Sequence, residues 1–326
     1  MPGMITHYIC AESTLAILPD DAKGILTANR QMYNIGSQGP DVFFYYYPSV
    51  LFSGRRGIGS IMHVQKTGEY IAAMAKGLRG LNGKAREAAF AYAAGYLTHY
   101  CLDCAAHPYV YYKTGFKRPG EKGSTLKYSA YHRSFETAID VLMLKLMSGK
   151  RPADEKLWRL IRSKRKAAMD VADFLGGCIS DVYGANIKGR HVYYAMRWMW
   201  RTTLLLQSAK GRRKRFMEIA EDIIIGNRVC SAMVHPQKVD GLDYLNNKKT
   251  PWKLPWDDGA ENHSSFTELF DEACNQAGEL VAALHECAFA DGDLEEFLAM
   301  AGNRSLKSGL DNSREAEFKY HDIIYR

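Results

Sequence analysis

The sequence of 326 residues lacks the features of a membrane-spanning or secreted protein. No apolar run approaches the roughly 20 residues that a helix needs to cross a bilayer. The N-terminus, MPGMITHYICAEST, has no basic leader, apolar core or small-residue cleavage site, so no secretory signal is visible. The 7 cysteines are odd in number and spread along the chain, which argues against a disulfide framework. These absences predict a cytoplasmic protein without a transmembrane segment.

A strong excess of one charge is also missing. Charged residues make up 24% of the chain, hydrophobic residues make up 47%, and the formal net charge is +7. This composition excludes intrinsic disorder and allows a substantial buried core. The small positive excess gives a weak preference for anionic partners, which include phosphate esters, nucleic acid and membrane surfaces.

Strand signals are scarce, because no segment shows a convincing alternation of apolar and polar residues. Apolar residues recur instead at the helical spacings of three and four. With no repeats, the whole chain, residues 1–326, is predicted to form a single all-α domain. Three longer connections are candidates for function, namely residues 36–59, 114–124 and 235–264. Helices are predicted over residues 10–18, 21–33, 62–79, 84–105, 125–148, 154–184, 187–209, 211–227, 264–290 and 293–302.

The most informative stretch is His99-Tyr-Cys-Leu-Asp103-Cys-Ala-Ala-His107-Pro108. Residues four apart share a helix face with Cβ atoms roughly 5–6 Å apart, so His99 and Asp103 could bind one metal ion. His107 would lie roughly 12 Å along the helix from His99, too far for a single zinc ion. Two ions with Asp103 between them fit this spacing better. Pro108 predicts that the helix ends at His107, which could then turn towards the second ion.

Further candidate ligands come from four other positions. His132 and Glu136 are again four residues apart, and with His107 they would leave a coordination position for water or substrate. His63 and Asp41 could complete a first site with the His99 and Asp103 pair. His7 could share a third, oxygen-rich ion with Asp103.

Each of these residues also has an ordinary interpretation. A single buried histidine is more often hydrogen-bonded in a core than bound to metal, and an Asp four residues from a His is usually a helix-face pair. Five of the 10 histidines, however, fall in the first 136 residues, in apolar or small-residue settings. Gathering these imidazole and carboxylate groups without a metal would carry a large desolvation penalty. The clustering therefore favours a metal centre.

The order of these motifs resembles the zinc-dependent phospholipase C family, which shares an all-helical multi-helix bundle and a trinuclear zinc site with fungal single-strand nucleases. The resemblance covers residues 5–140, and residues 140–326 carry no comparable motif. It implies a phosphoric ester hydrolase that holds two or three Zn²⁺ ions. The implied ligands are Asp41, His63, His99 and Asp103 for the first zinc, His107, His132 and Glu136 for the second, and Asp103 with His7 for the third.

Two departures from the family pattern affect this assignment. In the secreted enzymes an N-terminal tryptophan also holds the third ion, and here Met1 lies six positions before His7 with no such residue. The spacing between Asp103 and His107 is two residues shorter than in the secreted phospholipases. Without the tryptophan, the third site would lack two of its usual ligand atoms, the amino nitrogen and the carbonyl oxygen of that residue.

The implied mechanism is attack by a metal-activated water on a phosphodiester. Zinc lowers the pKa of bound water to near neutrality and polarises phosphoryl oxygens. Three carboxylates against two or three divalent ions leave a positive centre that attracts a phosphate anion. Asp41 is the candidate for orienting or deprotonating the water, although it could be a plain ligand. The substrate would be a phosphate ester such as a phospholipid; a single-strand-type nuclease and a non-catalytic, metal-stabilised binding protein are the alternatives.

Several other signals have two interpretations. The aromatic run Phe43–Tyr47 could bind a cationic head group by cation–π contact or pack in the core. Trp252 and Trp256 could cover the site as a lid or hold a long loop in place. Cys101-x-x-Cys104 could be a redox or structural zinc motif, but because there is no second Cys pair it is interpreted as two buried thiols. The basic clusters Arg162–Lys166 and Lys210–Arg215 are solvated helix faces that could also attract anionic lipid or nucleic acid. No chemistry is assigned to His191, His235, His263, His285 and His321.

Overall fold

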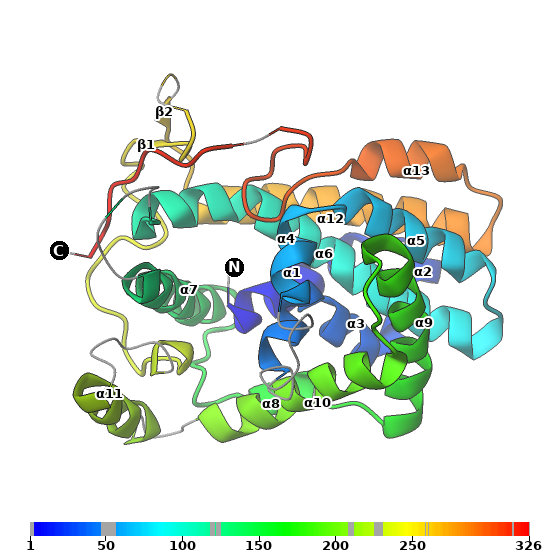
Figure 1. Cartoon of the computed structure of the whole chain (residues 1–326), viewed down its shortest axis with the longest axis horizontal. Coiled ribbons are helices and arrows are strands. Elements are labelled where there is room, and N and C mark those ends of the chain that lie inside the picture. Colours follow the sequence, from blue (N-terminus) through cyan, green and yellow to red (C-terminus); the bar gives the residue numbers. More distant parts are fainter. Residues whose placement is uncertain are drawn as a thin grey trace.

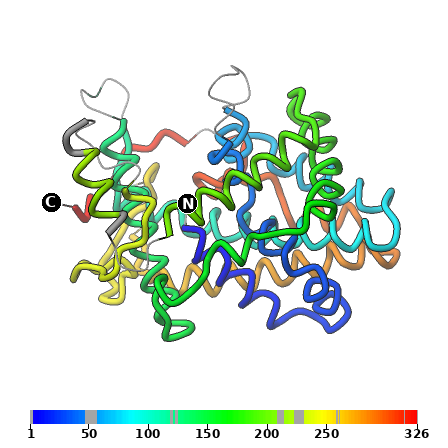
Figure 2. The backbone as a smooth tube through the Cα atoms, turned by 90° about the horizontal axis from the view of Figure 1, so that it is seen from below, coloured from blue at the N-terminus to red at the C-terminus, as the bar shows by residue number. Residues whose placement is uncertain are grey.

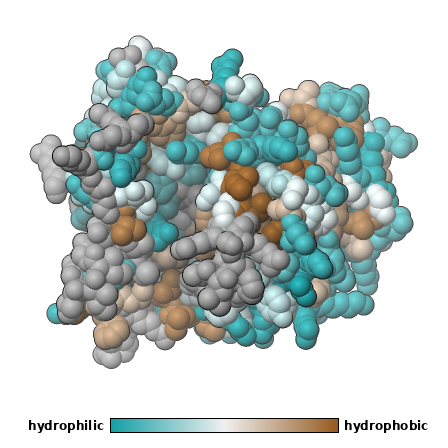
Figure 3. All heavy atoms as spheres, viewed as in Figure 1, coloured by the Kyte–Doolittle hydropathy of each residue, from teal (hydrophilic) through white to brown (hydrophobic). Residues whose placement is uncertain are grey.

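The computed structural model describes residues 3–46, 57–117, 121, 125–207, 212–224, 231–257, 259, 261–314 and 316–325. Over these residues the protein is helical, which confirms the predicted all-α class (Figure 1). In the described part of the chain, no helix has the length and apolar character needed to span a membrane. Hydrophilic side chains cover most of the coloured face in Figure 3, and apolar side chains gather in smaller patches.

The helices run in the following order: α1 (Met4–Ile17), α2 (Asp20–Ala28), α3 (Arg30–Gly36), the 3₁₀ helix η1 (Gly39–Tyr45), α4 (Ile58–Val64), α5 (Thr67–Arg79), α6 (Gly83–Thr114), α7 (Thr125–Ser148), α8 (Leu157–Leu160), α9 (Arg165–Tyr183), α10 (Gly189–Leu206), α11 (Arg212–Ile224), the 3₁₀ helix η3 (Ser231–Met233), α12 (Phe266–Phe289) and α13 (Leu294–Ala301). Two short antiparallel strands, β1 (Trp252–Lys253) and β2 (Glu261–Asn262), pair between η3 and α12.

The long helix α6 forms the centre of the structure. Its residues from Ala88 to Val110 are almost all buried, as expected for a helix that is apolar around its whole circumference. The helices α1, α3, α7 and α12 pack against it, and α12 lies alongside it in both Figure 1 and Figure 2. The side chains of α6 between Ala88 and Val110 are therefore largely shielded from water.

The contact between α3 and α6 depends on two glycines. A Cβ atom at Gly36 would lie 2.1 Å from the carbonyl oxygen of Tyr92, and one at Gly95 would lie 2.2 Å from that of Tyr33. Because real Cβ contacts do not reach such distances, only glycine allows these two backbones to approach so closely. The close approach brings the chain that follows α3 directly onto α6.

The structure divides three of the predicted helices. Lys66, with a φ of 54°, separates α4 from α5 within the predicted helix 62–79. Asn29 separates α2 from α3, and residues 161–164 separate α8 from α9. The predicted helix 125–148 is confirmed as α7, while the predicted loop 36–59 contains η1. Helical periodicity thus located the helices but not their interruptions, which each affect a single residue or a few residues.

The prediction that the helix ends at His107 is wrong, because α6 continues through Pro108 to Thr114. A proline inside a helix removes one N–H group and frees the carbonyl four residues earlier, which here belongs to Cys104. The chain around Gly309 packs on this carbonyl, since a Cβ atom at Gly309 would lie 2.4 Å from the Cys104 oxygen. A distant segment of the chain thus covers the carbonyl that the proline frees.

Trp252 holds the loop before α12 in place. Its side chain is 1% exposed, its indole Nε1 donates to the Ser264 carbonyl at 3.0 Å, and its ring contacts Tyr109 of α6. Trp256 packs on Phe318, with ring centroids 5.6 Å apart. Trp252 is therefore part of the core rather than a lid.

Candidate metal centre

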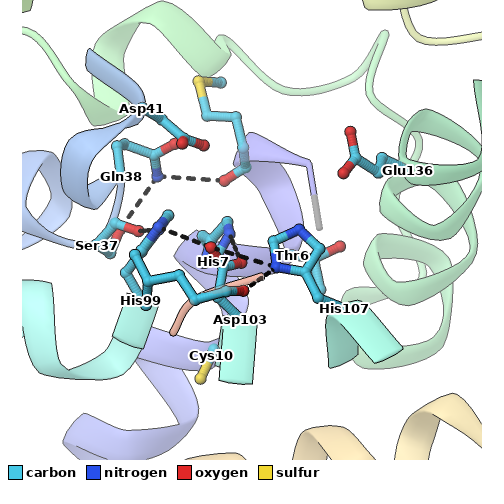
Figure 4. A network of polar contacts seen from close by, with 12 residues as sticks. Thr6, His7, Cys10, Ser37, Gln38, Asp41, His99, Asp103, His107 and Glu136 are labelled. Carbon is cyan, nitrogen blue, oxygen red and sulfur yellow. Dashed lines mark hydrogen bonds and ion pairs between the residues drawn. The ribbon is translucent and has the colours of Figure 1, made fainter. Parts of the chain in front are cut away.

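The eight predicted ligands meet at one place, where five helical elements converge. His7 comes from α1, Asp41 from η1 and His63 from α4. His99, Asp103 and His107 lie on successive turns of α6, and His132 and Glu136 lie on α7. Figure 4 shows the His7, Asp41, His99, Asp103 and His107 side chains gathered on one side, with Glu136 facing them from α7.

One group of side chains surrounds Asp103. The Asp103 carboxylate oxygens lie 3.1 Å from His99 Nε2, 3.3 Å from His7 Nε2 and 3.9 Å from His63 Nε2. Asp41 Oδ1 in turn lies 3.1 Å from His63 Nε2. Two overlapping sets offer ligand atoms within 4.8 Å of one another: His7 with Asp41 and His99, and His63 with His99 and Asp103. This group has the size and the nitrogen and oxygen donors of a zinc site.

A second group contains His107, His132 and Glu136, whose ligand atoms also lie within 4.8 Å of one another. His132 Nε2 is 2.7 Å from Glu136 Oε1, and the His107 and His132 rings are 5.7 Å apart. Asp103 Oδ2 lies 3.7 Å from His107 Nδ1, so Asp103 is situated between the two groups. Three protein ligands in one group is the pattern of a zinc site that leaves a position for water.

The interior of the cluster contains polar atoms that the described part of the chain leaves without well-aligned hydrogen bonds. Both ring nitrogens of His7, Nε2 of His99 and both oxygens of Asp103 are buried without a well-aligned hydrogen bond there, although the two Nε2 atoms lie 3.3 and 3.1 Å from the Asp103 oxygens. Leaving so many polar atoms unsatisfied would cost several kcal/mol, since each buried, unpaired polar group costs roughly 1–3 kcal/mol. Bound divalent cations would satisfy the Asp103 oxygens and one nitrogen of each ring. The residues present therefore fit a metal centre.

Backbone carbonyls orient three of the histidine rings. Nδ1 of His63 donates to the Gly59 carbonyl at 2.6 Å, and Nδ1 of His99 donates to the Ser37 carbonyl at 3.2 Å. Nδ1 of His107 makes the same kind of contact with the Leu306 carbonyl. A proton held at Nδ1 leaves the lone pair on Nε2, which is the arrangement found around metal-ligating histidines.

The ionisation of the cluster also suits a cation. Burial, together with the neighbouring His99, lowers the pKa of His7, and burial holds the pKa values of His107 and His132 well below the ordinary value. Burial opposes ionisation of Asp103, yet His107 and His99 hold its pKa well below the usual range. Burial would likewise lower the pKa of His99, but the Asp103 carboxylate raises it. Neutral imidazoles around an ionised carboxylate are the forms that bind metal, so His7, His107 and His132 are suited to a cation. His99, in contrast, would have to release the proton that Asp103 favours.

Comparison with protein families matches residues 6–193 to zinc-dependent phospholipase C. The chain belongs to the zinc-dependent phospholipase C family. This match confirms the resemblance of the ordered motifs and extends it past residue 140 into α10. Searches of curated proteins and of solved structures returned no match.

In this member of the zinc-dependent phospholipase C family, a carboxylate fixes the first turn of α1. Asp140 of α7 is fully buried and accepts hydrogen bonds from the backbone N–H of Ile5 at 3.2 Å and of Thr6 at 2.8 Å. The Thr6 hydroxyl also donates to it at 2.6 Å, and His235 Nε2 lies 2.7 Å away. Asp140 thus caps α1 from another helix and positions the neighbouring His7.

Neither Asp140 nor His235 was assigned a role from the sequence. A signal existed for Asp140, which lies four residues beyond Glu136 and therefore on the same face of α7. No local pattern connects it with His235, because the two residues are far apart in the sequence. A Cβ atom at Gly3 would lie 2.2 Å from Asp140 Oδ2, so a glycine is needed where the chain passes this carboxylate.

A segment after α13 supports two of the histidines. The backbone N–H of Leu306 donates to the His63 carbonyl at 2.8 Å, and the Leu306 carbonyl accepts from the His107 ring. The Ser305 hydroxyl also donates to the His63 carbonyl, at 3.3 Å. The sequence shows only a short, mostly polar segment between Gly302 and Gly309, so these contacts could not be predicted.

The aromatic run after Asp41 separates into different environments. Phe43 is buried in the core, whereas Phe44 is 46% exposed and its ring lies 5.3 Å from that of His63. The ring centroid of Tyr46 lies 6.4 Å from that of His191, and Tyr47 lies outside the described residues. Phe44 is therefore the member of the run whose surroundings fit contact with a substrate at this centre.

The thiols of Cys101 and Cys104 are buried and free, as the sequence predicts. Burial raises the pKa of Cys101 to about 12 and shifts that of Cys104 further in the same direction. A metal would require thiolates, so these groups behave as apolar side chains beside the centre.

Gly39 brings the chain against the His99 ring, and its replacement by alanine is expected to disturb the centre. Its φ is +50°, and a Cβ atom there would lie 2.4 Å from His99 Cδ2. The left-handed conformation costs an alanine roughly 1–2 kcal/mol, and overpacking adds roughly 1–3 kcal/mol. We expect Gly39→Ala to lower the free energy of unfolding by about 2–5 kcal/mol, measured by urea denaturation with chelator present.

Gly184 provides a matched control for that prediction. It has a φ of +62°, but a Cβ atom there would meet nothing within 4 Å. Gly184→Ala is therefore expected to show the conformational cost alone and to retain its bound zinc. Equal destabilisation by the two substitutions, with equal zinc content, would contradict a close contact between Gly39 and the His99 ring.

Proposed function

We propose that the protein is a zinc-dependent phosphodiester hydrolase of the phospholipase C type. The observation that carries the proposal is the buried group of unsatisfied imidazole and carboxylate atoms around Asp103, next to a second group of three ligands. In this assignment Asp41, His63, His99 and Asp103 hold one ion, and His107, His132 and Glu136 hold another. His7 and Asp103 would hold a third.

The exposure of the ligands indicates where a substrate could enter. Asp103 is completely buried, whereas the side chains of Glu136 and His132 are 10% and 16% exposed. The side chains of Asp41 and His63 are also slightly exposed, at 9% and 8%. The phosphate would therefore approach between η1 and α7, which places Asp41 on the substrate side of the centre.

Bound zinc would supply an ionisable water and polarise the phosphoryl oxygens. The protein's own residues would neutralise the charge of the ions, orient the ligand atoms and exclude bulk water. Asp103 places a negative charge between the two ligand groups. The Ser37 and Gly59 carbonyls hold the rings of His99 and His63 with Nε2 towards Asp103. Asp41 is assigned the role of accepting the proton of the attacking water. Phe44, beside His63, is assigned to cover the substrate.

A single-strand-type nuclease acting through the same centre is the second candidate, and a metal-stabilised binding protein without turnover is the third. The nuclease is favoured by the exposed basic cluster Arg162–Lys166, since exposed arginines bind phosphates of any origin. The cluster Lys210–Arg215 lies partly outside the described residues. These alternatives share the metal ligands and differ in substrate or in turnover.

The test uses full-length protein purified without chelator. We expect two or three zinc ions per chain by elemental analysis, and hydrolysis of a chromogenic phosphocholine diester that stops when a chelator is added. Zinc-free protein would contradict the metal centre. Cleavage of single-stranded DNA with the choline ester intact would favour the nuclease, and full zinc content without hydrolysis of either substrate would favour the binding protein.

A further inference from the structure

The outward face of α10 carries a stripe of basic and apolar residues. At roughly 100° per residue, the spacings of three and four place them on one side of the helix. Tyr194, Leu204 and Leu205 are 49%, 43% and 67% exposed. The helix runs along the lower edge of the molecule in Figure 1. The members of this stripe are Arg190, Tyr194, Arg197, Arg201, Leu204 and Leu205.

Two tryptophans flank the stripe and support its arginines. The Arg197 guanidinium lies 5.9 Å from the Trp200 ring centre, and that of Arg201 lies 5.4 Å from the Trp198 ring centre. Both tryptophans are half-buried. A guanidinium stacked on an aromatic ring retains its N–H donors for a phosphate. The arrangement therefore presents these cations in defined positions at the surface.

Carboxylates do not neutralise this stripe. The helix α10 contains no Asp or Glu, and none of its three arginines forms an ion pair with any residue that the structure describes. Asp173 of α9 lies against Gly189 at the start of α10, where a carboxylate complements the helix dipole. The rest of the helix is cationic and unopposed.

The neighbouring helix α8 repeats the same pairing. The Trp158 ring lies 5.2 Å from the Arg159 guanidinium and 5.9 Å from that of Arg162. Both arginines are exposed, and α8 packs against α10. Figure 2, which views the molecule from below, shows the two helices on this side of the molecule. Tryptophan-supported arginines thus occur on two adjacent elements.

We infer that this face of α10 docks the protein on a bilayer that contains anionic phospholipid. Arginines with exposed leucine, tyrosine and tryptophan are the composition of helices that lie in the lipid interface. Nucleic acid would use the arginines but would leave Leu204 and Leu205 facing water. The helix also packs on η1, which carries Asp41, so docking would bring the metal centre close to the lipid. The inference concerns binding and does not depend on turnover at that centre.

The experiment measures cosedimentation of the zinc-loaded full chain with vesicles of phosphatidylcholine, with and without phosphatidylserine. Near a membrane surface each basic residue contributes about 1 kcal/mol, so three contribute on the order of 100-fold in affinity. We expect Arg190→Gln, Arg197→Gln and Arg201→Gln together to weaken binding to the serine-containing vesicles by that factor. Thermal melting would verify that the variant is folded.

A charge-matched control replaces three exposed lysines elsewhere, Lys76→Gln, Lys84→Gln and Lys248→Gln, and should retain most of the binding. A second variant, Leu205→Gln, keeps the charge and is expected to weaken binding severalfold by removing an apolar contact. Equal loss in the lysine control would indicate attraction by net charge alone and overturn the inference. Unchanged vesicle binding by the arginine variant would also overturn the inference. So would a protein that binds single-stranded DNA but does not bind the vesicles.

Discussion

Replacing Asp103 with asparagine is expected to abolish hydrolysis and to remove zinc from both groups of ligands. Asp103 lies within 3.9 Å of His7, His63, His99 and His107, so among the carboxylates that the structure describes it is the one that contacts both groups. Asparagine has the same shape but no negative charge, and its amide N–H₂ would face nitrogen lone pairs. The metal supplies several kcal/mol of transition-state stabilisation, so we expect a loss of about 1,000-fold or more.

The measurement combines zinc content with the rate of phosphodiester hydrolysis. The matched variant is Glu136→Gln, which removes a carboxylate from the group of His107 and His132 alone. That variant should lose one zinc ion per chain, whereas Asp103→Asn should lose two or more. Wild-type zinc content in Asp103→Asn would contradict its position between the ions, whatever happened to the rate. A folded protein by circular dichroism is required of both variants.

The parts of the centre that follow local rules could be predicted from the sequence. His99 and Asp103, and likewise His132 and Glu136, are four residues apart on one helix, so their proximity follows from helical geometry alone. The convergence of these pairs with residues from α1, η1 and α4 does not follow from any local rule. It was inferred from the order of the motifs in a family, and the structure brings the same residues together.

The supporting contacts could not be predicted because they join distant segments. Pro108 predicts the end of a helix by its local preference, yet packing of the chain near Gly309 overrides that preference. The contact of Asp140 with His235 and the contact of His107 with Leu306 depend on how the C-terminal half folds back. Sequence pattern thus identified candidate ligands better than the residues that hold them in place.

Asp41→Asn is expected to lower the rate of hydrolysis by roughly 100- to 10,000-fold, the range ascribed to general acid–base catalysis. Asp41 lies at the slightly exposed side of the centre, with Oδ1 at 3.1 Å from His63 Nε2. Asparagine would preserve an oxygen at this position but could not accept a proton. The loss should therefore appear in kcat more than in KM, since the substrate would still meet the same cations.

Zinc content separates the two roles that Asp41 could have. If Asp41 takes the proton from water as well as contacting the first ion, Asp41→Asn should retain most of its zinc, because the asparagine oxygen and the other ligands, His63, His99 and Asp103, would still hold that ion. A plain ligand would instead lose zinc in proportion to activity, and added zinc would restore the rate. Glu136→Gln provides the reference for such a loss. Rescue of Asp41→Asn by excess zinc would therefore remove Asp41 from the proton transfer and leave the water to be activated by the ions alone.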